Sequence, residues 1–186
     1  MSELSDLLDP AGARRVVLWR DPPSGLTAAL VIDDLTLGPG AGGVRTRAYP
    51  GLAAAVAEAS ALARAMTRKC ALAGLAAGGA KAVVLDHPGL DRPAAFRALG
   101  RLVAELGGVF RTAGDLGTTA ADLAAMAETC PFVHPEEGGL TEAVARGLVG
   151  CARACARVCF CGFGGLPDAL PGRGRSGSAV ARALHA

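Results

Sequence analysis

The sequence is poor in aromatic residues, and this limits how its core can be built. Of its 186 residues, 51% are hydrophobic but only 4% are Phe, Trp or Tyr. We therefore expect a core of Ala, Leu and Val in closely packed helices and strands. The 19 basic and 17 acidic residues are mixed, without a basic stripe or interleaved aromatics. This pattern argues against nucleic acid as a partner.

Long hydrophobic runs and a secretion signal are also missing. Residues 1–10 carry three acidic side chains and lack the apolar centre of a signal peptide. The longest apolar runs, such as Cys70–Ala80, are interrupted by glycine and fall short of the roughly 18 residues that a membrane span needs. We expect a soluble, cytoplasmic protein with no membrane partner.

The six cysteines lack the spacing of a metal site. Cys151, Cys155 and Cys159 are four residues apart, which places them along one face of a helix. Zinc sites usually draw on Cys-x2-Cys pairs, and no histidine accompanies these three residues. We therefore expect no metal, and cysteines that are small buried apolar side chains in a reducing compartment.

Strand and helix signals alternate along most of the chain. Two β-like runs at 14–20 and 26–33, joined by the turn at 21–25, predict a hairpin. The segment Leu37–Arg45 has too much glycine for a strand, so a loop is expected there. The alanine-rich helix Leu52–Met66 carries two charges and is expected to be covered on most sides.

Further signals predict an apolar strand at 82–86, a helix from Asp91 to about Leu106 and a strand at 109–112. A last helix is expected over 141–159. This alternation favours an α/β fold with a mixed, largely parallel sheet and helices on both faces.

The segment from Met66 to Asp86 carries two lysines around an apolar, glycine-containing stretch. Lys69 and Lys81 flank eleven small or apolar residues, which we expect to form a loop after a helix that ends near Arg68. Glycine lets a ligand approach the backbone, and two ammonium groups suit an anion. Burial and a nearby cation lower the pKa of a lysine, as a general base at neutral pH requires. The stretch is not a P-loop, because its lysine comes one place late.

A second candidate site residue, Asp115, lies just past the strand predicted at 109–112. In α/β sheets, ligands bind beyond the carboxyl ends of strands, so this position favours a functional role. The alternative is that Asp115 only caps a turn or the helix that follows, a common use of aspartate. Spacing alone leaves both open.

Four motifs occur in order: Leu37-Gly-Pro-x-x-Gly-Gly-x-Arg45, Met66-Thr-x-Lys69, Leu75-Ala-Ala-Gly-Gly-Ala-Lys81 and Thr112-Ala-x-Asp-x-Gly-Thr-Thr119. Together they resemble the N-terminal substrate and dimerisation domain of the Glu/Leu/Phe/Val dehydrogenases, closest to the leucine, valine and phenylalanine enzymes. The likeness runs from about Val16 to Pro131. One departure is His87, where the family usually has Asp, Asn, Ser or Thr.

The resemblance implies oxidative deamination of a branched-chain or aromatic L-amino acid to its 2-oxo acid and ammonia, with NAD, in a homo-oligomer. It makes Lys69 the holder of the substrate carboxylate, Lys81 the general base and Asp115 the group that handles the amino proton. The implied pocket residues are Ala41, Gly42, Gly43 and Met66. The alternative function is a non-catalytic amino-acid-binding or oligomerisation module.

Residues 141–186 resemble a linking helix followed by an incomplete Rossmann fragment. Gly172, Gly174 and Gly177 have GxGxxG spacing, but no strand signal precedes them. The acidic residue expected about 20 positions later would lie beyond Ala186. We therefore divide the chain into a substrate domain (1–140) and a dinucleotide-binding fragment (141–186), and expect this polypeptide alone to bind NAD weakly or not at all.

Overall fold

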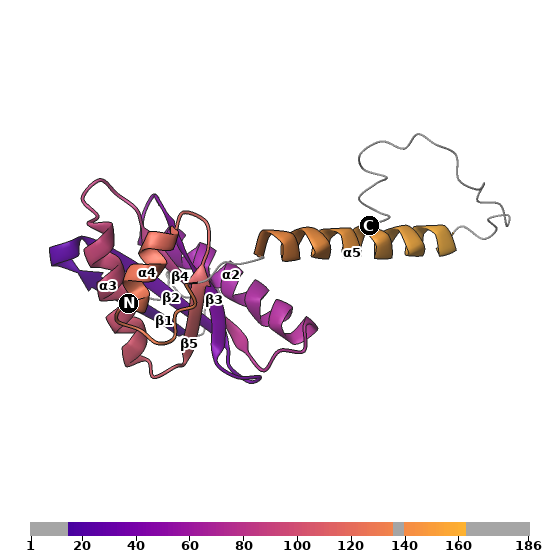
Figure 1. Ribbon diagram of the computed structural model, residues 1–186, viewed down its shortest axis with the longest axis horizontal. Coiled ribbons are helices and arrows are strands. Elements are labelled where there is room, and N and C mark those ends of the chain that lie inside the picture. Colours follow the sequence, from indigo (N-terminus) through magenta and orange to yellow (C-terminus); the bar gives the residue numbers. More distant parts are fainter. Residues whose placement is uncertain (1–14, 136–139, 163–186) are drawn as a thin grey trace. The chain divides into compact units, whose positions relative to one another are not determined.

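The computed structural model describes residues 15–135 and 140–162. The chain divides into two compact units, Met1–Glu137 and Gly138–Ala186. The described part of the first unit contains a five-stranded sheet, and that of the second is the helix α5 (Leu140–Gly162) (Figure 1). The predicted helix at 141–159 is therefore present. No helix in the described ranges combines the length and hydropathy that crossing a membrane requires.

The predicted hairpin is formed by β1 (Arg15–Asp21) and β2 (Leu26–Asp34), which pair antiparallel. Between them lies a single 3-10 turn, η1 (Pro22–Ser24). The Asp21 carboxylate accepts a hydrogen bond from the Ser24 amide at its start. Gly25 ends the turn at φ +72°, a left-handed conformation that favours glycine.

Three parallel strands complete the sheet: β3 (Gly40–Arg47), β4 (Gly78–Leu85) and β5 (Phe110–Gly114). The strand order is β1-β2-β4-β3-β5, with β3 parallel to both β4 and β5. Only β2 runs against the other four strands, because it pairs antiparallel with β1 and β4. The prediction of a mixed, largely parallel sheet is confirmed.

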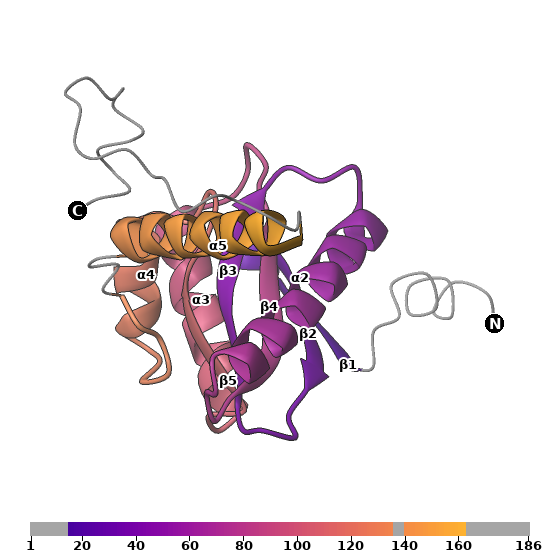
Figure 2. The ribbon, with the colours of Figure 1, turned by 90° about the vertical axis from the view of Figure 1, so that its right-hand side faces the viewer.

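Helices cover both faces of the sheet (Figure 2). Alternate residues of β2 point to opposite faces, as the two-residue period of a strand requires. Ala29 and Val31 pack toward α2 (Leu52–Leu72), whereas Ala28, Leu30 and Ile32 join the cluster under the other two helices.

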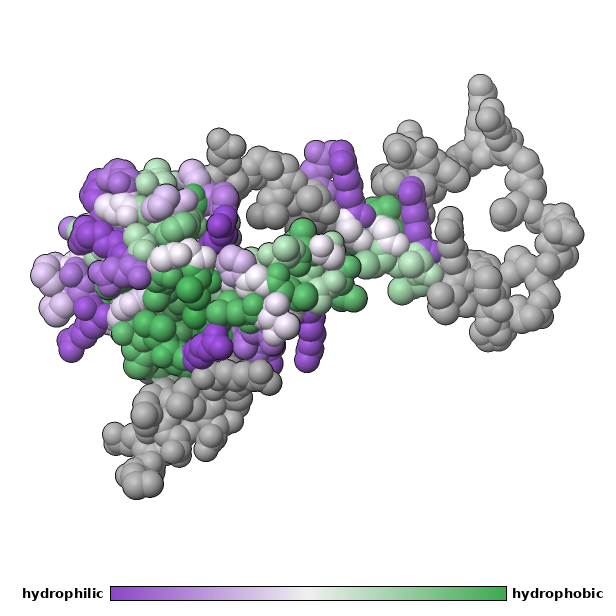
Figure 3. All heavy atoms as spheres, turned by 90° about the horizontal axis from the view of Figure 1, so that it is seen from below, coloured by the Kyte–Doolittle hydropathy of each residue, from purple (hydrophilic) through white to green (hydrophobic). Residues whose placement is uncertain are grey.

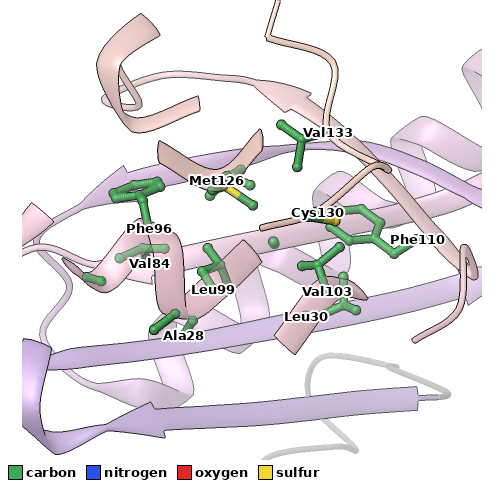
Figure 4. Packing of buried hydrophobic residues seen from close by; sticks show 14 of the residues in the cluster. Ala28, Leu30, Val84, Phe96, Leu99, Val103, Phe110, Met126, Cys130 and Val133 are labelled. Carbon is green, nitrogen blue, oxygen red and sulfur yellow. The ribbon is translucent and has the colours of Figure 1, made fainter. Parts of the chain in front are cut away.

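Those two helices are α3 (Arg92–Glu105) and α4 (Ala120–Ala127), and the larger hydrophobic cluster lies beneath them. Phe96, Leu99, Phe110 and Met126 are fully buried in it (Figure 4). The predicted start of α3 is confirmed, since the Asp91 carboxylate accepts a hydrogen bond from the Ala94 amide. Its predicted stop is confirmed by two glycines with positive φ, Gly107 and Gly108.

The glycine-rich segment corrects the sequence interpretation. We expected a loop at Leu37–Arg45, but Gly40–Arg47 is a strand between β4 and β5. Glycine here serves close packing. A Cβ on Gly42 would overlap the Ala80 carbonyl oxygen of β4, and one on Gly40 would lie 2.8 Å from the Ala80 Cβ. Composition alone does not distinguish this use of glycine from a flexible loop.

The expected boundaries of the lysine segment are also wrong. Helix α2 continues to Leu72, so Lys69 lies on its last turn, and β4 begins at Gly78, so Lys81 lies within a strand. The apolar loop joining them is therefore much shorter. The expectation that this helix is covered on most sides fails as well. Only one face is buried, because no described element of the unit covers its exposed alanines, which are Ala53, Ala54, Ala57 and Ala61.

The cysteines divide into two groups. Cys70 and Cys130 are buried, as expected. Cys151 and Cys155 are exposed, which contradicts the expectation, because α5 is the only described element of its unit and nothing described there covers them. Within the described residues no group of three His, Cys, Asp or Glu side chains could hold a metal ion.

We predict that Gly42→Ala destabilises the first unit by about 3 kcal/mol, because an added methyl group must push β3 away from β4. Gly51→Ala is the matched control. Gly51 has an extended φ and no atom within 4 Å of an added Cβ, so the cost should stay below about 1 kcal/mol. Urea unfolding of both variants measures the difference, and equal midpoints would contradict the packing argument.

Candidate active site

The candidate site lies on the α2 face of the sheet, where three neighbouring strands come together. Strand β5 is short, and its last residue, Gly114, pairs with Val44 in the middle of β3. Val44 also pairs with Ala82 of β4. Asp115 is the residue after β5 and Lys81 lies on β4, so β3 runs between the two residues.

Lys81 and Asp115 form an ion pair above β3, with Nζ 2.6 Å from Oδ2. Lys81 is only 5% exposed, so almost all contact of its side chain with water is lost. Glycine at position 43 of the intervening strand leaves room for the pair. A Cβ there would lie 3.1 Å from Lys81 Nζ and 3.0 Å from Asp115 Cβ. The two side chains therefore meet in the space that the missing side chain of Gly43 leaves above β3.

Two charged residues that sequence reasoning did not assign complete this cluster. Arg45 Nε donates to the same Asp115 Oδ2 at 2.9 Å, and Arg45 Nη1 donates to Glu58 Oε1 at 2.6 Å. Glu58 also lies 3.5 Å from Arg47. The signals were present: Arg45 ends the first glycine motif, and Glu58 is an isolated acid in an alanine-rich helix.

The local environment shifts the ionisation of both central groups. Burial lowers the pKa of Lys81, the hydrogen bond to Asp115 opposes this, and the charges of Arg45 and Lys69 lower it further. For Asp115, burial acts to raise the pKa, but hydrogen bonds from Lys81 and Arg45 outweigh it and bring the pKa to about 2. Asp115 is therefore ionised at neutral pH.

The loop that carries Asp115 is pinned to β3 by hydrogen bonds. The Thr46 amide donates to the Leu116 carbonyl at 3.0 Å, and Thr118 Oγ1 donates to the Val44 carbonyl at 2.7 Å. Arg92 adds a bond to the Gly117 carbonyl at 2.8 Å. These bonds hold the loop in place without using the Asp115 side chain.

The capping alternative for Asp115 can be compared directly with the structure. Helix α4 is capped by Thr119, which forms a capping box with Asp122. The carboxylate of Asp115 points instead to Lys81 and Arg45. Asp115 therefore does not cap the helix that follows.

The other predicted substrate residues lie on α2 and β3 and differ in exposure. Lys69 is exposed on the last turn of α2, and its positive charge lowers the pKa of Lys81. Met66 lies one turn earlier on the same helix and is half-buried. On β3, Ala41 is half-buried, whereas Gly42 is buried against the β4 backbone and contributes packing.

The predicted cofactor residues Gly172, Gly174 and Gly177 lie outside the described residues. GxGxxG spacing also occurs at Gly38–Gly43, but that segment enters a strand, whereas a dinucleotide-binding turn opens a helix. No described glycine turn therefore fits a dinucleotide, and the assignment of 141–186 to a cofactor fragment stays a prediction.

The described unit thus combines an α/β sheet with a buried lysine–carboxylate pair beside an exposed lysine, the three residues that the motifs singled out. Comparison with known proteins identifies the family. Residues 14–132 match the dimerisation domain of the Glu/Leu/Phe/Val dehydrogenases. The chain belongs to this family, which confirms the resemblance seen in the motifs.

Individual relatives agree. Leucine dehydrogenase of Bacillus cereus is 43% identical over 132 residues, which cover 70% of this chain and 36% of the relative. Phenylalanine dehydrogenase of Lysinibacillus sphaericus is 36% identical over 183 residues, or 94% of this chain and 48% of the relative. The solved L-tryptophan dehydrogenase from Nostoc punctiforme superposes with a TM-score of 0.63 at 32% identity, covering 68% of this chain and 37% of that one. The chain thus spans less than half the length of these relatives.

We predict that ionised Asp115 contributes about 2 kcal/mol to stability, and that low pH removes this contribution. Its folded-state pKa of about 2 lies below the ordinary 3.8, so the stabilisation is complete above the ordinary value and is lost as pH falls through about 2. The difference in unfolding free energy between wild type and Asp115→Asn should therefore shrink from pH 6 to pH 2.

Urea titrations at several pH values test this. Glu105→Gln, at an exposed position of α3, is the control and should differ from wild type by a small, constant amount. A difference between wild type and Asp115→Asn that stays constant with pH would contradict the proposed ion pair.

Proposed function

We propose that this chain provides the substrate side of an amino-acid dehydrogenase, which deaminates a branched-chain or aromatic L-amino acid to its 2-oxo acid and ammonia with NAD. The Lys81–Asp115 pair carries the proposal, because it places a nearly buried proton acceptor in contact with a half-buried carboxylate. Kinship with leucine, valine and phenylalanine dehydrogenases supports the choice of substrate class.

Lys69 is the proposed holder of the substrate carboxylate. Its ammonium group is exposed, and among the described residues it forms no ion pair. An α-carboxylate bound there would keep the amino acid beside Lys81, since the charges of the two lysines already interact. A charge-assisted hydrogen bond of this kind contributes more than a neutral one.

Lys81 and Asp115 are the proposed proton-transfer residues. NAD, when bound, supplies the acceptor for the hydride that leaves Cα. Neutral Lys81 then takes a proton from the water that attacks the imino carbon. Asp115, ionised at neutral pH, accepts a hydrogen bond from the substrate amino group and exchanges its proton. The low pKa of Asp115 favours this acceptor role before the proton moves.

We also propose that the protein is a homo-oligomer in the cytoplasm. The matched family domain is described as a dimerisation domain. Hydrophobic residues gather on one face of the first unit, bordered by hydrophilic ones (Figure 3). In addition, the edge strand β1 exposes Leu18.

A second candidate is a non-catalytic module that binds an amino acid or forms oligomers. One observation favours it: the described residues bring Lys81 and Asp115 together but include no glycine turn suited to a dinucleotide. Turnover distinguishes the two functions.

We predict that Lys69→Ala weakens binding of a 2-oxo acid at least about tenfold, because one charge-assisted bond to the carboxylate is lost. Calorimetry with 4-methyl-2-oxopentanoate and phenylpyruvate measures this. Arg68→Ala removes the neighbouring exposed cation of the same helix turn and should change the affinity little. Equal loss in both variants would show only general attraction of anions.

We predict that reduction of NAD, followed at 340 nm with leucine, valine or phenylalanine, is abolished by Lys81→Ala if the chain is catalytic. Without its base, the water step cannot proceed at a useful rate. Amino-acid binding without any NAD reduction by the wild type would instead support the non-catalytic module. Absence of both binding and turnover would reject catalysis and amino-acid binding, and would leave only the oligomerisation module.

A further inference from the structure

The ion pair between Arg45 and Glu58 is more enclosed than an ordinary surface pair. The side chains of Arg45 and Glu58 are 18% and 25% exposed, against 44% and 53% for the surface pair of Arg97 and Glu128. Glu58 projects from a helix face that otherwise consists largely of alanine. Exposed pairs stabilise proteins little, and this enclosed pair also contacts the candidate site, so a role beyond stability is worth considering.

The position of Arg45 suggests what that role is. Its Nε donates to the same carboxylate oxygen of Asp115 that accepts from Lys81. Two cations therefore share one anion. Arginine stays protonated at any physiological pH, whereas a buried lysine can lose its proton. When Lys81 becomes neutral, Asp115 still has a positive partner.

Glu58 fixes Arg45 in this position. Two nitrogens of the Arg45 guanidinium group bind different carboxylates: Nε donates to Asp115 and Nη1 donates to Glu58. Arg47 Nη1 lies 3.5 Å from the other carboxylate oxygen, Glu58 Oε2. The charged or titratable groups that act on Lys81 directly are Asp115, Arg45 and Lys69.

We propose that Arg45, held by Glu58, is a positioning residue that keeps Asp115 ionised and in place, and thereby lets Lys81 release its proton. This inference rests on the proposed role of Lys81 as a base. Without Arg45, the ammonium of Lys81 would be the main partner of a half-buried carboxylate, and its proton would be held more firmly.

The chain offers an unusually direct test, because Lys69 and Lys81 are its only two lysines. Protein labelled with ¹³C at lysine Cε gives two side-chain signals, whose shifts report ionisation of each amine during a pH titration. Lys69→Arg assigns the signals and keeps the charge. In Arg45→Gln, the midpoint of Lys81 should rise by about one pH unit, the order of shift that a nearby charge causes.

Two further variants test the specificity of this effect and the role of Glu58. Arg97→Gln makes the same chemical change in the surface pair and should leave the Lys81 midpoint unchanged. Glu58→Gln weakens the bond that holds Arg45, so Asp115 should depend more on Lys81 and the Lys81 midpoint should rise, by less than in Arg45→Gln.

A Lys81 midpoint that fails to rise in folded Arg45→Gln overturns the proposal. If circular dichroism shows that Arg45→Gln does not fold, Glu58→Gln decides: a rise supports the proposal, and the absence of a rise overturns it. The titration needs no substrate or turnover. A shift without amino-acid binding would therefore reject the proposed function, whereas binding without a shift would reject only the role of Arg45.

Discussion

The pairing of Lys81 with Asp115 across β3 is the interaction on which the rest of the site depends. A lysine that is nearly buried needs a carboxylate, because an uncompensated charge in the interior is costly. Asp115 follows a different strand, and the partners meet because β5 ends opposite the middle of β3 and glycine at position 43 leaves room between them. The short strand, the glycine and the pinned loop all serve this one contact.

The surroundings lower the pKa of both central groups, which favours the ionised form of Asp115 and the neutral form of Lys81. Burial and the neighbouring cations favour neutral lysine, while two cationic hydrogen-bond donors favour ionised aspartate. If Lys81 and Asp115 formed a pair alone, the proton would stay on the lysine. Arg45 is a second positive partner of Asp115 and changes that balance, and Arg45 is itself held by Glu58 of α2. Helix α2 thus supplies both the exposed Lys69 and the anchor for the internal charges.

Much of the fold and the main site residues could be predicted from the sequence, because their signals are local. The hairpin follows from two apolar runs around a Pro-Pro-Ser-Gly turn, and α3 from its Asp cap and terminal glycines. The positions of Lys69, Lys81 and Asp115 came from motifs with family-specific spacing. The limits of α2 and the nature of β3 were missed, because alanine and glycine patterns do not reveal which element packs against them.

The sequence by itself therefore determined which segments become helices and which become strands β1, β2, β4 and β5, and which lysines and aspartate are candidates for the chemistry. Only the tertiary structure decided that the glycine-rich segment is a strand between β4 and β5, and that Arg45 and Glu58 join the charge cluster. The reason is physical. Capping and periodicity act between residues a few positions apart, whereas the contacts of Asp115 with Arg45 and Lys81 span 70 and 34 positions and exist only once the sheet has formed.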